Sequence, residues 1–274
     1  MEEHLQDILG SHGEGLAGRR IALGVSGSVA ALETHRVARL LMRHGAQVHV
    51  VMSPSARELV SPTALHWATG NPVTTGLTGA CEHLKLVGER GSCHAFLVAP
   101  ATANTIGKMA LGIDDSPLTT VAVTALGRGL PSLVAPGMHA CMLDHPAVKA
   151  NLARLEEMGV RVIAPERLEA KAKMASAEVI LAEVGRMLGP ASLAGKRVLM
   201  TGGPTREPLD PARYLTNPSS GRMACSLAAE AYRRGAEVHL VYGPGQTAPP
   251  PGIKVEKVER TAEMLEAVER ALAE

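Results

Sequence analysis

Small polar residues follow several apolar runs of this chain, where they could bind a ligand through hydroxyl, amide and backbone groups. Pro100 ends the apolar run Ala95–Ala99, and the stretch after it, Ala101–Thr105, carries only small side chains and one amide, Asn104. Because nothing bulky projects from this stretch, a flat ligand could lie against its backbone, held by the threonine hydroxyls and the amide. The alternative is an ordinary strand-to-helix connection in which Thr or Asn only caps the helix.

Serines stand after two earlier apolar runs, at positions that suit a phosphate. Ser26, Gly27 and Ser28 follow the predicted strand Arg20–Val25, and Ser53 follows the next predicted strand, Gln47–Met52. Hydroxyl groups and free N–H groups at the start of a helix bind phosphate oxygens well. The pattern is not the dinucleotide fingerprint, because the first turn lacks G-x-G-x-x-G and Ser53 stands where an acidic residue would hold a ribose. Ser and Gly are also favoured in any tight turn, which is the simpler interpretation.

Two histidines lie in segments that could support acid–base chemistry. His83 lies within the segment EHLKL, and His139 follows the small residues Pro136 and Gly137 after another apolar run. Imidazole changes charge near neutral pH and can therefore act as a base, although a single histidine is more often structural. The local sequence leaves both interpretations open at His83.

The elements that must position these residues alternate between strand and helix. Apolar runs of strand length separate helical patterns from Arg20 onward, which predicts an α/β fold: a doubly wound, flavodoxin-like parallel sheet with helices on both faces. In such a fold the carboxyl ends of the strands carry the ligand site. Within this domain we expect one helix over Asp144–Met158, a strand over Val160–Ala164 and a lysine-bearing loop over Glu166–Met174.

A second, smaller domain follows in the sequence. Residues 1–188 form the first predicted domain, the Gly- and Pro-containing segment 189–195 is a linker, and the pattern starts again over 196–274. We expect strands over Lys196–Thr201, Glu237–Tyr242 and Val255–Val258, with a final helix over Thr261–Ala273. Three strands without a fourth are few for a doubly wound sheet, so we expect only part of a Rossmann-like domain.

The composition argues against several classes of protein. With 28 Lys and Arg against 27 Asp and Glu the formal net charge is +1, and aromatic residues make up 2% of the chain. Balanced charge offers no attraction to nucleic acid or to an anionic membrane surface, and few rings are available to stack on bases. The four cysteines form no CxxC pair, so neither a metal site nor a disulfide framework is expected. Reduced thiols and the absence of a signal peptide or a membrane span predict a cytoplasmic protein.

Taken together, the motifs resemble a known family. The segments VSGSVAA, VMSPSA, APATANTIGKMALGIDDSPLTT and APGMHACM, in this order, are similar to motifs of the flavin-containing Cys decarboxylases. The segments TGGPTREPLDPARYLTNPSSGRM and GAEVHLVYGP resemble the ligase domain that is fused to them. The chain therefore resembles, over nearly its whole length, the bifunctional phosphopantothenoylcysteine decarboxylase / phosphopantothenate–cysteine ligase family of coenzyme A biosynthesis.

The resemblance implies FMN-dependent decarboxylation of 4'-phosphopantothenoylcysteine to 4'-phosphopantetheine. FMN oxidises the thiol of the cysteinyl group, carbon dioxide leaves and the flavin returns the electrons, while the protein orients the substrate and moves protons. The implied cofactor-binding residues are Ser26, Gly27, Ser28, Ser53, Thr102, Ala103, Asn104, Thr105, Thr119 and Thr120. His83 aligns with the active-site base of the family, in a motif that is usually written H-I-E-L and reads HLKL here.

Two segments depart from the pattern of the family. Where the family has P-x-M-N-x-x-M this chain has PGMHACM, so His139 replaces the Asn that orients the substrate carboxylate. An imidazole could do so by a hydrogen bond, and more strongly if protonated. The flap that usually carries a Cys reads EAKAKM here. Lys171 or Lys173 could clamp a phosphate or carboxylate or donate the proton, and the alternative is a solvated basic loop.

For the second domain the resemblance implies activation of phosphopantothenate by CTP, an acyl-cytidylate intermediate and assistance by Mg²⁺. Asn217 matches the Asn that contacts this intermediate. The implied phosphate-facing residues are Gly203, Thr205, Arg206, Ser219, Ser220 and Gly221. The cytidine-binding segments and the Lys-rich catalytic loop of the family have no counterpart before Glu274, so we expect no ligase reaction from this chain by itself.

The resemblance also implies a homo-trimer or a multiple of trimers, with the flavin near subunit contacts and a small-molecule substrate as partner. Three alternatives stay open: a non-catalytic FMN-binding regulatory protein, a flavin prenyltransferase-like enzyme and a plain nucleotide-binding module. The fused second domain argues against the prenyltransferase, and the missing dinucleotide fingerprint argues against the nucleotide module. A flavin spectrum together with carbon dioxide release would separate these classes.

Overall fold

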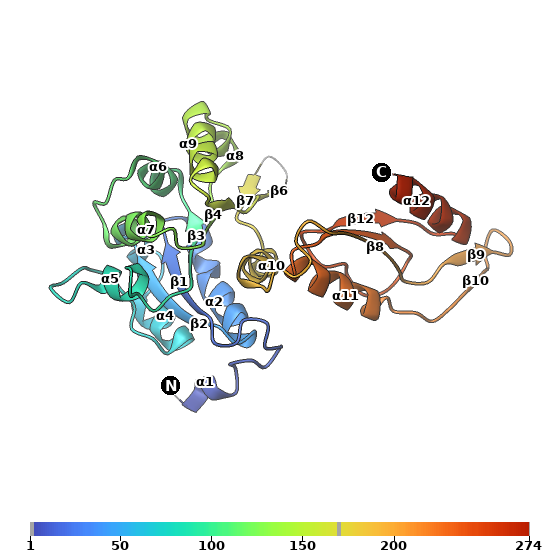
Figure 1. The fold of residues 1–274 in the computed structure, drawn as a ribbon, viewed down its shortest axis with the longest axis horizontal. Helices are drawn as coiled ribbons and strands as arrows, with labels where there is room; N and C mark the ends of the chain where they lie inside the picture. Colours follow the sequence, from blue (N-terminus) through green and yellow to red (C-terminus); the bar gives the residue numbers. More distant parts are fainter. Residues whose placement is uncertain (1–2, 169–170, 274) are drawn as a thin grey trace. The chain divides into compact units, whose positions relative to one another are not determined.

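The computed structural model describes residues 3–168 and 171–273 of the chain. Two compact units make up this chain, residues 1–184 and residues 185–274. Figure 1 shows that each unit has a sheet of its own. No helix among the described residues is long and apolar enough to cross a membrane.

Five strands form the main sheet of the first unit, and all are parallel in the order β2-β1-β3-β4-β5. Their bounds are β1 Arg20–Val25, β2 Gln47–Met52, β3 Ala95–Ala101, β4 Ser132–Pro136 and β5 Arg161–Val162. This is the strand order of flavodoxin-like proteins, in which a ligand binds where the order reverses, at β1 and β3. The predicted fold class is therefore confirmed.

Helices cover both sides of this sheet (Figure 1). One side packs against α5, α6, α7 and α9, and on the other side α2 contacts β2 and α4. The helices of the first unit are α1 Glu3–Gln6, η1 Val29–Glu33 (a 3-10 helix), α2 Thr34–Arg43, α3 Pro54–Arg57, α4 Pro62–Thr69, α5 Glu82–Val87, α6 Ala103–Leu111, α7 Pro117–Gly127, α8 Ala140–Leu143, α9 Pro146–Glu157 and α10 Ala177–Leu188, which continues into the second unit.

The centre of the first unit is an aliphatic core around β3. All seven residues of β3 are buried, as expected for a parallel strand with helices on both faces. Phe96 packs in one cluster with Leu118 and Val121 of α7. Gly24 of β1 permits this close packing, because a Cβ there would lie only 2.4 Å from Leu118 Cδ1. The position of α7, and of the threonines at its start, therefore depends on glycine at position 24 of the sheet.

Four sequence expectations about the first unit differ from the structure. Pro100 does not end its strand, because the register of β3 shifts between Val98 and Ala101 and such an irregularity tolerates a residue without an N–H. The single helix expected over Asp144–Met158 is interrupted, since Pro146 begins α9 at a position where proline is favoured.

The segment expected as a loop over Glu166–Met174 forms an antiparallel hairpin instead, with strands β6 Glu166–Leu168 and β7 Lys171–Lys173. The strand expected over Val160–Ala164 is reduced to the two residues of β5. Both differences concern short pairings, which a local apolar pattern describes poorly.

Three parallel strands in the order β12-β11-β8 form the sheet of the second unit. Its elements are β8 Arg197–Gly202, β9 Arg206–Pro208, β10 Tyr214–Thr216, α11 Arg222–Arg233, β11 Glu237–Tyr242, β12 Lys254–Lys257 and α12 Thr261–Ala273. β9 and β10 form a separate antiparallel hairpin. Cys225, Leu240 and Tyr242 are the buried residues of one small core cluster of this unit.

Candidate functional site

The carboxyl ends of β1 and β3 are joined by the hydroxyl group of Ser26. This hydroxyl donates a hydrogen bond to the carbonyl oxygen of Pro100 at 2.8 Å and accepts one from the backbone N–H of Thr102 at 2.9 Å. Ser26 is 1% exposed, so both bonds are shielded from water. The side chain therefore fixes the strand ends rather than offering its hydroxyl to a ligand.

The end of β4 is attached to the same region through Ser28. Its hydroxyl donates to the carbonyl oxygen of Gly137 at 2.8 Å. The same hydroxyl accepts from the N–H of Ala30, so Ser28 is the N-cap of η1. The N–H of Gly137 in turn donates to the carbonyl oxygen of Ala101 at 3.0 Å. Three strand ends, those of β1, β3 and β4, are thus linked by hydrogen bonds over residues far apart in sequence.

Ser53 follows β2 and completes the row of strand ends. Its N–H donates to the carbonyl oxygen of Val25 at 3.0 Å, and its hydroxyl accepts from the N–H of Ala56 and so caps α3. Gly27 lies so near to α3 that a Cβ added to it would lie 2.5 Å from Ser55 Cβ. A Cβ on Gly137 would lie 2.9 Å from Pro100 Cβ. Glycine at these two positions is therefore a packing requirement of the strand ends.

The start of α6 offers backbone donors next to these strand ends. Thr102 caps the helix: its hydroxyl accepts from the N–H of Thr105 at 3.3 Å and lies 3.1 Å from the Thr105 hydroxyl. The N–H groups of Ala103 and Asn104 are the first of the helix and have no partner within it. Asn104 is exposed, whereas Thr105 is buried. An anionic or polar ligand could use these groups and the positive end of the helix dipole.

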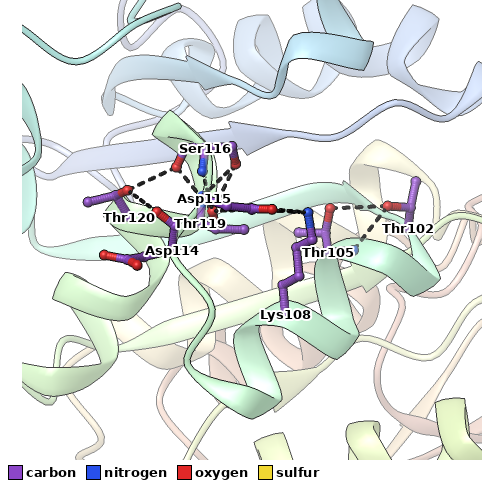
Figure 2. A network of polar contacts seen from close by, with 8 residues as sticks. All are labelled: Thr102, Thr105, Lys108, Asp114, Asp115, Ser116, Thr119 and Thr120. Atoms are coloured by element: carbon purple, nitrogen blue, oxygen red, sulfur yellow. Dashed lines mark hydrogen bonds and ion pairs between the residues drawn. The ribbon is translucent and has the colours of Figure 1, made fainter.

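A network of polar contacts ties α6 to the start of α7, as Figure 2 shows. Lys108 donates to both carboxylate oxygens of Asp115, at 2.7 and 3.0 Å, and this hydrogen bond lowers the pKa of the Asp115 carboxyl. Ser116 and Thr119 form a capping box at the start of α7. Thr120 donates its hydroxyl proton to the carbonyl oxygens of Asp114 and Ser116, so neither threonine hydroxyl is free of the protein.

An open cleft with a volume of about 910 Å³ lies beside the ends of β1 and β4. Its walls come from η1, α2, the loop after β4, β7 and the start of α10. The lining residues include Ser28, Arg36, Met138, His139, Lys173 and Met174. Arg36 is paired with Glu178 at 2.8 Å across the cleft wall. The cleft combines apolar thioether groups with cationic and imidazole side chains, which suits an organic anion.

His139, which lines this cleft, contacts a cysteine. Its Nδ1 lies 3.1 Å from Cys141 Sγ and accepts from the N–H of Cys141 at 3.4 Å, and both residues are exposed. Lys173 lies on β7 and is exposed, and its side chain faces the same cleft. The side chain of Lys171 lies outside the described part of the structure, as do Glu169 and Ala170.

His83 is not brought to the cleft within one chain. It lies in α5, which packs against α7 on the other side of the sheet, and it is not among the residues that line the cleft. Its Nδ1 atom is buried and has no hydrogen-bond partner among the described residues. Buried polar atoms are normally hydrogen-bonded, so this nitrogen is free to bond to a group other than the described residues of its own chain.

The second unit has a Gly-rich region at the carboxyl ends of its strands. Gly203 and Gly221 both have a φ of +78°, and a Cβ on Gly221 would lie 2.0 Å from the Tyr242 hydroxyl oxygen. Only glycine adopts this conformation in so little space. The Tyr242 hydroxyl donates to the carbonyl oxygen of Thr247 at 2.8 Å, and burial raises its pKa to about 12. Ser220 accepts from the same hydroxyl at 3.3 Å through its carbonyl oxygen.

A second cleft, of about 660 Å³, lies in this region and includes Arg206, Lys257, Glu259 and the segment 242–249. The Arg206 guanidinium stacks on the ring of Tyr214 at 4.9 Å. The hydroxyl of Thr205 contacts that of Thr261 at 3.1 Å. The side chains of Asn217 and Ser219 are exposed. Among the described residues no group of three His, Cys, Asp or Glu side chains is placed to hold a metal ion.

Several of these site features were not anticipated from the sequence. Lys108, Asp115 and Ser116 form the network that connects the two helix starts, and Cys141 contacts His139. The capping box could have been found, because Ser followed by Pro and, three residues after the Ser, by Thr indicates a helix start. The Lys–Asp pair could not, since the two residues meet only after the intervening loop turns back.

The fold and the first site define a parallel α/β protein with a ligand-binding region at the carboxyl ends of its central strands. Residues 9–189 match the family described as Flavoprotein, and residues 193–274 match the DNA/pantothenate metabolism flavoprotein C-terminal domain. The coenzyme A biosynthesis bifunctional protein CoaBC of Thermococcus kodakarensis is 48% identical over 99% of this chain, which spans 67% of that relative. The chain belongs to the family of these coenzyme A biosynthesis bifunctional proteins.

Solved structures similar to the first unit agree with this assignment. An FMN-dependent cysteine decarboxylase, SpaF, aligns with 30% identity and a TM-score of 0.54 over 61% of this chain and 94% of its own. A mutant PPC decarboxylase in complex with pantothenoylaminoethenethiol aligns with 27% identity and a TM-score of 0.53, over 61% of this chain and 96% of its own. The chain is thus similar in fold to an FMN-dependent cysteine decarboxylase and to a PPC decarboxylase, and it spans about two thirds of the length of the relative from Thermococcus.

Proposed function

We propose that the first unit is an FMN-dependent decarboxylase that converts 4'-phosphopantothenoylcysteine to 4'-phosphopantetheine. The observation that carries this proposal is the joining of three strand ends by Ser26 and Ser28 beside a cleft that contains His139. Small residues at these ends leave backbone and hydroxyl groups facing a common edge, and the similar solved structures include FMN-dependent decarboxylases. The proposal concerns the activity of this chain and rests on its family for the identity of the substrate.

The strand ends fit FMN by their own geometry. The turns after β1 and β2 carry only small residues here, with Gly27 packed directly on Ser55 of α3, and the N–H groups of Ala103 and Asn104 at the start of α6 have no partner within the helix. Gly27, Ser28 and Ser53 are assigned to the phosphate and ribityl chain, and Ala103 and Asn104 to the flavin ring. Ser26, Thr105, Thr119 and Thr120 support these groups through buried or committed hydroxyls. FMN supplies an electron acceptor for the substrate thiol, which makes loss of carbon dioxide favourable.

The cleft residues bind and orient the substrate. His139 Nδ1 already accepts from the backbone N–H of Cys141, so Nε2 carries the hydrogen of the neutral ring and is the donor that remains for a carboxylate. Lys173 provides a positive charge at the same cleft, and Lys171 on the same hairpin is assigned a similar role. Met138 and Met174 cover apolar surface of the substrate and exclude water from the reacting thiol.

His83 is assigned to the active-site base, and its position implies that the site is shared between copies of the chain. His83 lies on α5 and His139 lines the cleft on the other side of the sheet, so one chain alone does not bring them together. A homo-trimer or a multiple of trimers would place His83 of one copy near the cleft of the next. Mixed oligomers of His83→Asn and His139→Ala protomers should then regain activity that each variant lacks by itself. Mixtures that stay inactive would show that both groups act within one chain.

The basic test is spectroscopic and chemical. Purified protein should show a flavin absorption spectrum and release carbon dioxide from 4'-phosphopantothenoylcysteine. His83→Asn should keep the flavin and lose turnover, because the substitution removes a base without touching the strand ends. A protein that binds flavin but releases no carbon dioxide would indicate a regulatory FMN-binding protein instead. A protein that cannot be loaded with FMN would contradict the proposal altogether.

For the second unit we assign the role of the N-terminal part of a CTP-dependent phosphopantothenate–cysteine ligase domain. We assign segment 189–195 as the linker that precedes it, between the end of α10 at Leu188 and the start of β8 at Arg197. Gly203, Gly221 and the cleft at Arg206 suit a nucleotide phosphate, with Thr205, Asn217, Ser219 and Ser220 around the acyl intermediate and Mg²⁺ as the accompanying cation. Titration of the chain with CTP in the presence of Mg²⁺, with the heat of binding measured by calorimetry, tests this assignment. The four free thiols fit a reaction in the reducing cytoplasm.

A further inference from the structure

The loop after β4 contains a cysteine and a histidine in direct contact. Cys141 Sγ lies 3.1 Å from His139 Nδ1, and the Cys141 N–H donates to the same nitrogen at 3.4 Å. The Cys141 N–H can only donate, so Nδ1 accepts and the hydrogen of the neutral ring lies on Nε2; in this tautomer the thiol is the donor in the contact between Sγ and Nδ1. A thiol in contact with an imidazole nitrogen is an arrangement that enzymes use to move a proton between sulfur and nitrogen.

The two residues differ in what they face. His139 lines the cleft of about 910 Å³, whereas Cys141 is exposed and is not among the lining residues. The imidazole thus stands between the cleft and a sulfur that is open to solvent. The charged residues that line the cleft together with His139 are Glu33, Lys173 of β7 and the Arg36–Glu178 pair.

Decarboxylation creates a need for a proton at this place. The reaction replaces a carboxylate by a hydrogen atom, so one proton must reach the carbon from which carbon dioxide departs. The flap hairpin has no cysteine to supply it, since residues 166–174 read ERLEAKAKM. The group that holds the carboxylate is well placed to deliver the proton once the carboxylate has left.

From this geometry we infer that Cys141 delivers protons to His139 during the proposed decarboxylation. His139 Nε2–H gives its proton to the carbon that has lost carbon dioxide, and Cys141 Sγ–H gives its proton to Nδ1. Nε2 then takes one proton from solvent and Nδ1–H returns its proton to the Cys141 thiolate, which restores the first tautomer and the thiol. One proton is consumed from solvent and no electron moves in the relay. The inference rests on the proposed function and makes Cys141 a positioning residue that acts through His139.

Alkylation by iodoacetamide, with or without bound FMN, tests the contact between Cys141 and His139 independently of turnover. Cys81 is the matched control, because it is also exposed and its sulfur contacts only a carbonyl oxygen, that of Gly79 at 3.8 Å, among the described contacts. At pH 7, peptide mass spectrometry should find Cys141 alkylated at least about fivefold faster than Cys81. His139→Asn keeps a good helix cap and should remove this excess without changing Cys81. Equal rates at the two cysteines in the wild-type protein would overturn the inference.

Steady-state decarboxylation tests the role of the contact in turnover. Cys141→Ser keeps a hydrogen-bond donor to Nδ1 but replaces the thiol by a much weaker acid, so kcat should fall about tenfold while KM stays within about twofold. Cys81→Ser should leave both constants unchanged. An unchanged kcat in Cys141→Ser would refute the relay. If the wild-type chain releases no carbon dioxide, the proposed function fails, and the alkylation rates still decide whether His139 activates Cys141.

Discussion

Replacing Ser26 by alanine should loosen the strand ends on which the candidate site is built. The hydroxyl donates to Pro100 O at 2.8 Å and accepts from Thr102 N at 2.9 Å, and the residue is 1% exposed. Alanine has nearly the same volume, so the loss is polar rather than a matter of packing. Pro100 O keeps the N–H of Ser26 at 3.3 Å, whereas the N–H of Thr102 loses its acceptor.

The size of the effect follows from these two bonds. A neutral hydrogen bond contributes about 1 kcal/mol net, and a buried donor left without a partner costs about 1–3 kcal/mol, so Ser26→Ala should lower the free energy of unfolding by about 2 kcal/mol. For a unit of this size each kcal/mol corresponds to roughly 2–4 °C in Tm, which gives a decrease of about 4–8 °C. FMN affinity should also fall about tenfold, because Thr102 sets the start of α6 and its free N–H groups.

Urea unfolding followed by tryptophan fluorescence measures this effect in the first unit alone. The chain has one tryptophan, Trp67, and it lies in α4 of that unit. Ser11→Ala is the control, because Ser11 is an exposed serine of the same unit. A midpoint for Ser26→Ala equal to that of the control would refute the role assigned to the Ser26 hydroxyl.

Three other perturbations test separate parts of the chain. Gly27→Ala adds a Cβ only 2.5 Å from a serine side chain of α3 and should abolish FMN binding in a fluorescence titration, whereas Gly76→Ala, with open space around it, should not. Hydrogen bonds from Arg233 hold the pKa of the Glu230 carboxyl at about 2, below its ordinary 4.5. The pair therefore stabilises the fold above pH 4.5, and this stabilisation is lost as the pH falls toward 2. If an NMR titration of the Glu230 carboxyl gives the same pKa in Arg233→Gln as in the wild-type protein, this account is wrong. Burial raises the pKa of Cys93 to about 11, so a disulfide reagent at pH 8 should modify it only in urea, and rapid modification of the folded protein would refute its burial.

The strand pattern was readable from local sequence alone. The bounds expected for Arg20–Val25, Gln47–Met52 and Glu237–Tyr242 agree with those of β1, β2 and β11. These strands are short and largely apolar segments between turn residues, because most of their residues are buried. Helix Thr261–Ala273 was equally clear, since its apolar residues recur at helical spacing and its bounds agree with those of α12.

Local sequence patterns did not predict the structure where strand pairing or the place of a proline within a strand decided it. Pro100 looked like the end of a strand, yet β3 continues through it because its neighbours hold the irregular segment in place. The hairpin of β6 and β7 depends on backbone pairing between residues of low apolar content. Neither outcome is encoded in the spacing of apolar residues.

By itself the sequence determined the kind of fold, the order of its strands and helices, and the small residues that stand after the strands. Only the tertiary structure decided what those residues do. Ser26 bonds to Pro100 across 74 residues, and Ser28 bonds to Gly137 across 109. Such contacts arise from the strand order β2-β1-β3-β4-β5, which brings distant strand ends to one edge. The same order keeps His83 away from the cleft of its own chain, and no local pattern contains that separation.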